Sequence, residues 1–314
     1  MLKTNNAQPT RFAFPRLTRS DAFVALLLTF TVLLGGYFRF IGLNWDDNTR
    51  FHPDERFLTI NVGSQIGRGY LSFNQSPVEI RSDEEQLANC QARYPDSPNG
   101  VGGYFDAECS DMNPHNTGSN GLYVYGTLPL FTAHWVGQTL EQITGGGGWS
   151  SGNLHLTWRA ISALCDALVV LMVFFIGQRL HGKWTGLLAA FLYACAVLPI
   201  QIAHFGTADA MTNLWVAMTF LFLVRAQDNG TLWDYALCGA AFGVALASRV
   251  NIAPLVIAII FAAAVRILPA LDNTLPRSER WRAFTYNFGG LVLAGGVTLL
   301  VFRIFNPYAF LGPG

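Results

Sequence analysis

Two adjacent acidic residues follow the first long apolar stretch of the chain, in the segment Phe51-His52-Pro53-Asp54-Glu55-Arg56-Phe57. A carboxylate held behind a proline near a membrane surface can act as a general base toward a hydroxyl group that arrives from outside, provided that its pKa suits the task. The same pattern is also typical of a helix start, with Asp54 as N-cap, Glu55 in the first turn and a short helix over 56–69. The pattern alone leaves catalysis and capping as alternatives.

Two arginines lie where the chain is otherwise poor in positive charge. Arg159 belongs to Trp158-Arg159-Ala160-Ile161-Ser162-Ala163, and Arg249 lies in the short turn Ala247-Ser248-Arg249-Val250-Asn251. Because arginine presents a planar fork of N–H donors, both are predicted to contact a lipid phosphate. For Arg159, snorkelling to ordinary lipid headgroups is the alternative.

A histidine and an acid flank the polar break Gln201-Ile202-Ala203-His204-Phe205-Gly206-Thr207-Ala208-Asp209. Ionisable residues at membrane depth are functional candidates. Metal ligation by His204 and Asp209 is one interpretation, but they lack the tight spacing of a dedicated metal site, which favours a hydrogen-bonded structural pair. A divalent metal therefore stays an open question. Asp166, inside an apolar stretch, is predicted to make a buried polar contact between helices.

Cys90 and Cys109 lie together in one long polar loop. If this loop faces an oxidising compartment, the two cysteines could pair and close a loop that has little apolar content of its own. Two free thiols are the alternative, because sequence cannot show that their Cα atoms approach. The other three cysteines lie in apolar stretches, where a thiol behaves as a small hydrophobic group: Cys165, Cys195 and Cys238.

The elements that must position these residues are membrane-spanning helices. Of the 314 residues, 51% are hydrophobic and 13% are charged, which is far more apolar than a soluble domain, and the net charge of zero gives nucleic-acid binding no support. A span needs roughly 20 apolar residues. The predicted fold is therefore all-α and polytopic, with about seven transmembrane helices at 21–43, 156–178, 186–204, 208–226, 233–249, 251–269 and 284–305.

The distribution of basic residues predicts which loops face the cytoplasm. The first stretch is too long for a signal sequence and lacks a convincing cleavage site, so we expect an uncleaved anchor with a cytoplasmic N-terminus. The loops after the second, fourth and sixth helices then carry the expected cytoplasmic charges: Arg179, Lys183, Arg225, Arg266, Arg277, Arg280 and Arg282. This prediction divides the chain into a cytoplasmic tail (1–20), a first helix (21–43), an external loop (44–155), a six-helix bundle (156–305) and an external tail (306–314).

The external loop contains no lysine and is acidic on balance, and its later part, Leu122 to Thr144, is apolar and aromatic. Pro129 interrupts this part, and Gly145 to Gly148 end it. We expect a helix that lies in the membrane interface, because a spanning helix would move every later loop to the other side and invert the arginine bias. All the candidate residues then fall on the external face.

The order and sidedness of these features resemble the multi-spanning glycosyltransferases of the GT-C fold, in particular the protein O-mannosyltransferases and the lipid A aminoarabinose transferases (glycosyltransferase family 39-like). The segments that carry the resemblance run through most of the chain: Pro53-Asp54-Glu55, Leu122-Tyr123-Val124-Tyr125-Gly126-Thr127-Leu128-Pro129-Leu130, Arg159 to Ala163, Arg179 to Gly186, Asp209 and Arg249. Relatives of this kind are longer, so the chain resembles the N-terminal part of such an enzyme.

The resemblance implies a hexosyltransferase, mannosyltransferase-like, in the plasma membrane. It would transfer a sugar, with inversion, from a polyprenyl-phosphate donor to a protein or lipid-linked acceptor on the outer face, in contact with membrane lipids. Asp54 would be the base and Glu55 would support it. Arg159 and Arg249 would stabilise the leaving lipid phosphate. The remaining candidates for substrate binding are His52, His204 and Asp209.

Two other classes of protein remain as alternatives. A transporter or flippase of a lipid-linked or anionic solute would show repeated halves and discontinuous helices with charge near the bilayer midplane. The sequence instead concentrates its charge in one external loop and at the outer helix ends, which favours the enzyme. A non-catalytic membrane subunit is the third class.

Overall fold

The computed structural model describes residues 18–63, 66, 88–90, 92, 104–110, 112–116, 123–268, 274 and 276–309, and this part of the chain is helical without strands. Four helical segments in it are long and apolar enough to cross a membrane: Arg19–Phe40 (α1), Leu154–His181 (α6), Val250–Ile267 (the 3-10 turn η3 at Val250–Leu255 with α11 at Val256–Ile267) and Arg277–Phe305 (α12). The prediction of an all-α membrane protein is therefore confirmed.

A fifth span is formed by α7 (Lys183–Ala194) and α8 (Val197–Ala203), if this pair, bent by 58° at its break, is taken as one crossing. The other two predicted spans are also helical, as α9 (Asp209–Asn229) and α10 (Leu232–Ser248). α10 has 17 residues, which makes it roughly 26 Å long, slightly short of the hydrocarbon core. In the described residues, every predicted stretch is thus helical, with 186–204 divided into two helices, and four to five crossings meet the length and apolarity of a span.

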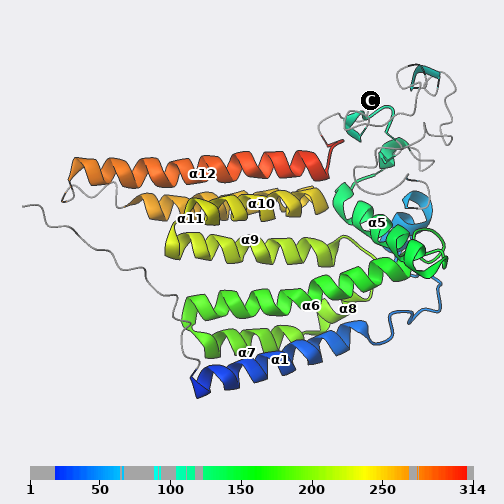
Figure 1. Cartoon of the computed structure of the whole chain (residues 1–314), viewed down its shortest axis with the longest axis horizontal. Helices are drawn as coiled ribbons and strands as arrows, with labels where there is room; N and C mark the ends of the chain where they lie inside the picture. The colour runs from blue at the N-terminus through cyan, green and yellow to red at the C-terminus, as the bar shows by residue number, and fades with distance from the viewer. Residues whose placement is uncertain are drawn as a thin grey trace, which may run out of the picture.

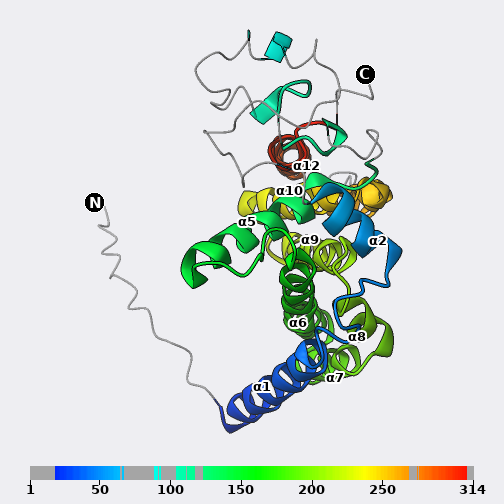
Figure 2. The same cartoon turned by 90° about the vertical axis from the view of Figure 1, so that its right-hand side faces the viewer.

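The long helices lie side by side, and the elements of the first loop gather at one end of them (Figure 1). We call this the loop end: it holds α2 (Pro53–Arg56), the π-helix η1 (Phe57–Val62), the short η2 (Pro114–Asn116) and α5 (Thr127–Thr144). Viewed toward the loop end, α5 lies across the ends of α6 and α10 (Figure 2). The opposite end carries ion pairs between helices, Lys183 with Asp21 and Arg179 with Asp228.

Glycines let neighbouring helices approach closely within the bundle. A Cβ atom at Gly177 of α6 would lie 2.8 Å from the Cα of Gly186 in α7, and one at Gly239 of α10 would lie 2.2 Å from the carbonyl oxygen of Ala294 in α12. Small residues at such crossings allow the van der Waals contact that drives helix association in lipid. These contacts fix α7 against α6 and α12 against α10.

A buried ion pair links the first helix to α6. The Nε of Arg39 lies 2.5 Å from Oδ2 of Asp166, and both side chains are at most 1% exposed. Arg39 also donates to the carbonyl oxygens of Gly35 and Ala194, while the Tyr193 hydroxyl donates to Asp166. The polar interhelical contact predicted for Asp166 is therefore confirmed, with Arg39 as its partner.

The loop end has a hydrophobic core of its own. Leu58 and Val62 of η1 pack with Leu130 and Phe131 of α5 and with Trp158 of α6, and all five side chains are at most 1% exposed. Hydrogen bonds attach this core to the end of α12, where Tyr104 donates to the carbonyl oxygen of Ile304 and Thr127 to that of Phe305. The loop end is thus packed onto both early and late helices.

The helix that follows the acid pair begins earlier than predicted. Pro53 is its first residue and His52 its N-cap, without a side-chain capping bond, so Asp54 lies inside the first turn and does not cap the helix. Proline suits this place, because its missing N–H is one that a helix start leaves unpaired anyway. The helix continues as η1 to Val62; except for Gly63 and Ile66, the rest of the predicted 56–69 helix lies outside the described residues.

In the structure, Cys90 and Cys109 form a disulfide with their Cα atoms 5.4 Å apart. We expect that a membrane-impermeant maleimide will label neither cysteine before reduction, and both after mild reduction. Mass spectrometry of the peptides that contain these two cysteines makes the measurement. Cys195, which is exposed and free, is the internal reference for thiol reactivity in detergent. Labelling of Cys90 and Cys109 without reductant would contradict the bridge.

Candidate functional site

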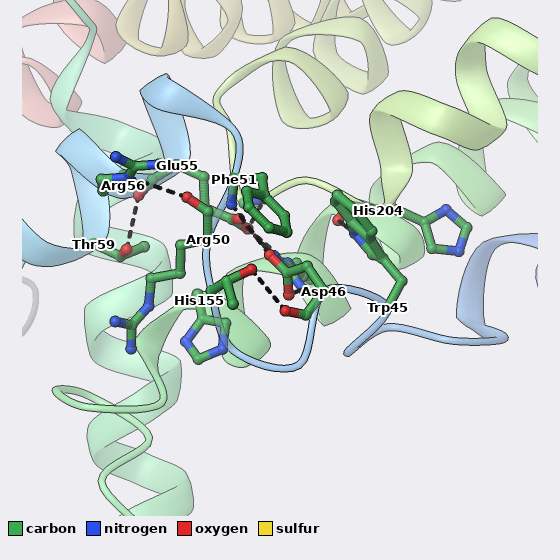
Figure 3. A network of polar contacts seen from close by, with 12 residues as sticks. Trp45, Asp46, Arg50, Phe51, Glu55, Arg56, Thr59, His155 and His204 are labelled. Carbon is green, nitrogen blue, oxygen red and sulfur yellow. Dashed lines mark hydrogen bonds and ion pairs between the residues drawn. The ribbon is translucent and has the colours of Figure 1, made fainter.

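A buried cluster ties the first external segment to α6. The guanidinium of Arg159 binds Asp46 through two hydrogen bonds of 2.8 and 2.7 Å, and binds both carboxylate oxygens of Glu55 at 2.7 and 2.6 Å. The side chains of all three are 0% exposed. Asp46 and Glu55 come from the two ends of one loop segment, with Phe51 between them (Figure 3).

Every N–H of Arg159 has a protein partner in this cluster. Beyond the two carboxylates, one N–H donates to the carbonyl oxygen of Leu43 at 2.8 Å, so all five donors of the guanidinium are used. In this structure the Arg159 side chain offers neither a free donor nor an exposed surface to the phosphate contact that the resemblance implied. Its side-chain partners are the carboxylates of Asp46 and Glu55.

Glu55 is held as tightly as Arg159. One of its carboxylate oxygens also accepts from the backbone N–H of Gly206 at 2.7 Å, in the turn between α8 and α9. A Cβ atom at Gly206 would lie 2.9 Å from that oxygen, so the approach suits glycine. Of the predicted acid pair, Glu55 is thus buried, and Asp54 is the member that is partly exposed.

The same cluster fixes the charge of Asp46. Hydrogen bonds from Arg159 lower the pKa of the Asp46 carboxyl to about 2, against the opposing effect of burial. A carboxyl whose pKa lies below its usual range of about 3.9 contributes stability at all pH values above that range, and loses the contribution as the pH falls toward 2. Asp46 is therefore ionised throughout the physiological range.

A second, more open cluster contains three of the predicted site residues. Arg249 at the end of α10 forms an ion pair with Asp209 at the start of α9, with 2.8 Å between Nη1 and Oδ1 and side chains 28% and 34% exposed. The guanidinium of Arg249 lies over the ring of Tyr125, 5.6 Å from its centroid. Burial raises the pKa of Tyr125 to about 12, and the nearby carboxylate of Asp54 acts in the same direction. Asp54, Tyr125, Arg249 and Asp209 thus meet at the loop end.

A backbone contact explains why Tyr125 reaches Arg249. The N–H of Gly126 donates to the carbonyl oxygen of Ser248 at 3.1 Å. A Cβ atom at Gly126 would lie 1.9 Å from the carbonyl oxygen of Ala247, so only glycine permits the two segments to come this close. The residues that flank this contact, Tyr125 and Arg249, are brought together as a result.

The two predicted histidines lie beside these clusters. The ring nitrogens of His204 lie 2.7 and 2.9 Å from the carbonyl oxygens of Ile200 and Ile41, so His204 joins α8 to the end of α1. His52 packs against Phe205, with ring centroids 4.6 Å apart. Among the described residues, no group of three or more His, Cys, Asp or Glu side chains is placed to hold a metal ion.

Two residues of these clusters were not singled out from the sequence. Asp46 is one of many acids in the loop, and its partner Arg159 is 113 residues away. Tyr125 is part of the aromatic segment before α5, where its spacing indicates only interfacial packing. For Tyr125, the glycine that follows was the available signal, since an isolated glycine can mark a close backbone approach.

The fold and its two ionisable clusters together define an all-α membrane protein of the polytopic class, with a polar site at one end of the helix bundle.

The comparisons with known proteins agree with the predicted resemblance. Residues 132–276 match the model of the family described as dolichyl-phosphate-mannose-protein mannosyltransferase, a GT-C glycosyltransferase family. The matched range contains Arg159, His204, Asp209 and Arg249, while Asp54 and Tyr125 precede it.

A curated relative points the same way. The chain is 31% identical over 98 residues to undecaprenyl phosphate-alpha-4-amino-4-deoxy-L-arabinose arabinosyl transferase 2 from Sodalis glossinidius (strain morsitans). This alignment covers 31% of the chain and 18% of the relative. The aligned part of the chain therefore spans less than a fifth of that protein's length.

Proposed function

We propose that this chain forms the site of a membrane glycosyltransferase, which transfers a sugar from a polyprenyl-phosphate donor to a protein or lipid-linked acceptor. The observation that carries the proposal is the meeting of Asp54, Tyr125, Arg249 and Asp209 at the loop end. This open cluster combines the partly exposed carboxylate of Asp54 with the partly exposed guanidinium of Arg249. The family match and the named donor of the aminoarabinose transferase support the same reaction class.

In the proposed reaction, Asp54 takes the proton of the acceptor hydroxyl. The acceptor oxygen forms a bond to the anomeric carbon as the bond from that carbon to the phosphate oxygen breaks, and a single displacement of this kind inverts the anomeric centre. The electron pair leaves with the lipid phosphate, whose negative charge Arg249 stabilises. Asp209 orients Arg249, and the Tyr125 hydroxyl orients Asp54.

The sidedness of the site is part of the proposal. Basic residues predicted to be cytoplasmic form ion pairs at the opposite end of the bundle, as Arg179, Lys183 and Arg225 do. Together with the positive-inside rule, this arrangement supports an external loop end in the plasma membrane. A lipid-linked donor could then reach Arg249 from the outer leaflet.

A second candidate function is transport of a lipid-linked solute. The specific observation that favours it is the break between α7 and α8, which lies beside the buried Arg39–Asp166 pair, since discontinuous helices with nearby charge are typical of transporters. Against it, the carboxylate of Asp166 is already engaged by Arg39 and Tyr193. The glycosyltransferase remains the better supported function.

The test is transfer of a labelled sugar from a polyprenyl-phosphate donor in membranes that contain the chain, beside membranes from the same cells without it. We expect label on a protein or lipid-linked acceptor only where the chain is present, with release of polyprenyl phosphate in equal amount. Movement of the intact labelled donor between leaflets without transfer would support the transporter. Equal labelling in both membranes would contradict the enzyme.

A further inference from the structure

The segment between Asp46 and Glu55 contains an unusual turn. Asp47, Asn48 and Arg50 have φ values of 50°, 66° and 52°, the only positive φ angles of residues other than glycine in the described part of the chain. Asparagine and aspartate tolerate this left-handed region, but arginine rarely adopts it. Such conformations persist only where the surrounding structure holds them in place.

Contacts from α6 hold this turn on both sides. Before the turn, Arg159 binds Asp46, whose carboxylate also accepts from the N–H of Phe51 at 3.3 Å. Within it, the side chain of Asn48 lies 3.0 Å from Nε2 of His155. After it, Arg159 binds Glu55, which precedes η1. One guanidinium therefore connects the two ends of the turn.

The position of Asp54 depends on these contacts. Asp54 lies directly before Glu55, in the four-residue helix whose first residue is Pro53. Because Glu55 is bonded to both Arg159 and Gly206, the backbone at Asp54 is fixed relative to α6 and to the start of α9. The α9 start also carries Asp209, the partner of Arg249. The buried cluster therefore sets the distance between Asp54 and the ion pair of Asp209 with Arg249 in the open cluster.

We propose that Arg159 is a positioning residue, which holds Asp46 and Glu55 and so keeps the 47–50 turn in the conformation that presents Asp54 to Tyr125. This inference rests on the proposed function for its effect on the reaction rate. Arg159 acts through Glu55 and does not touch substrate, since it is 0% exposed and has no unused N–H. Displacing a reacting group by about 1 Å can lower a rate by roughly 10²-fold.

The experiment compares Arg159→Met, Arg159→Lys and Asp46→Asn with the parent protein in nanodiscs, using a labelled polyprenyl-phosphate sugar as the donor. We expect Arg159→Met to lower kcat by roughly 10²-fold, with the donor KM within about 3-fold of the parent value. Arg159→Lys can hold one carboxylate at a time and should recover part of the rate. Asp46→Asn keeps the contact between Arg159 and Glu55, so this variant should fold even if Arg159→Met does not. We expect it to lower kcat by about 10-fold.

Hydrogen exchange gives a readout that does not depend on activity. The amides of Phe51 and Gly206 donate directly to Asp46 and Glu55, so in Arg159→Met both should exchange at least 10-fold faster, while α6 amides below the cluster keep their protection. If the parent transfers no sugar, the proposed function fails, but the exchange rates still decide whether Arg159 holds the turn. Unchanged exchange with a donor KM raised 10-fold or more would overturn the inference and make Arg159 a substrate contact. A parent-like kcat in folded Arg159→Met would overturn it as well.

Discussion

Replacing Asp54 by asparagine is expected to lower sugar transfer by roughly 10²-fold or more, because asparagine keeps the size of the side chain and an oxygen for the Tyr125 hydroxyl but cannot accept a proton. Asp54 is partly exposed, so the change should leave the thermal unfolding temperature of the protein nearly unchanged. The measurement is the initial rate of transfer of labelled sugar at saturating donor, compared between purified parent and variant.

A matched control for this variant lies in the same loop. Asp47 is exposed, and asparagine tolerates its φ of 50°. Asp47→Asn removes one negative charge close to the same site and should keep the transfer rate within about 2-fold of the parent. If Asp54→Asn also stays within a few-fold of the parent, Asp54 is not the base. If both variants lose transfer equally, the loss comes from removing a negative charge near the site, and the result gives no support to Asp54 as the base.

The largest effect on stability is expected for Asp166→Ala, which leaves Arg39 charged, buried and unpaired. Removing one partner of a buried ion pair typically costs about 3–5 kcal/mol. The Tyr193 hydroxyl, which donates to Asp166, loses its acceptor as well. We expect a clear fall in the thermal unfolding midpoint in detergent, and recovery of most of it in the double variant Arg39→Met/Asp166→Leu, which removes both charges and fills the space.

The opposite end of the bundle provides the control for this comparison. Asp228 pairs with Arg179 where the two side chains are 47% and 35% exposed, and exposed pairs contribute only about 0–1 kcal/mol. Asp228→Ala should therefore shift the unfolding midpoint little. If Asp166→Ala and Asp228→Ala lower the unfolding midpoint by similar amounts, the buried Arg39–Asp166 pair contributes no more to stability than the exposed Arg179–Asp228 pair, and the prediction is wrong.

The helices could be predicted well from the sequence because each apolar stretch has about the length of a span and polar residues separate neighbours. The patch from Gln201 to Asp209 is an example, since α8 ends and α9 begins within it. The bend between α7 and α8 was not predicted, although Pro199 was an available signal: it lies in the first turn of α8, and in a continuous helix its ring would clash with the carbonyl group of Cys195, where α7 ends. The early helix start at Pro53 was missed for a related reason: Asp54 is a favoured capping residue and His52 is not, but proline is favoured at the first helical position and decides the start.

The site was predictable only in part. Asp54, Asp209 and Arg249 could be recognised as ionisable residues on one face, and the structure brings them together around Tyr125. The carboxylate partners of Arg159 could not be predicted, because an arginine at a helix end suits a phosphate and a carboxylate equally well. What decides between them is the fold, which brings Asp46 and Glu55, more than 100 residues earlier in the chain, to the same guanidinium.

The hydrogen bonds from the loop end to the end of α12 also bear on biosynthesis. Tyr104 and Ser110 bond to Ile304 and Tyr308, 200 and 198 residues later in the chain. A ribosome adds about 5–20 residues per second, so these partners emerge roughly 10–40 s after the loop. During this interval the aromatic surface of Tyr104 has no α12 to cover it. A chaperone or the translocation machinery that shields this surface until the last helix inserts would therefore raise the yield of folded protein.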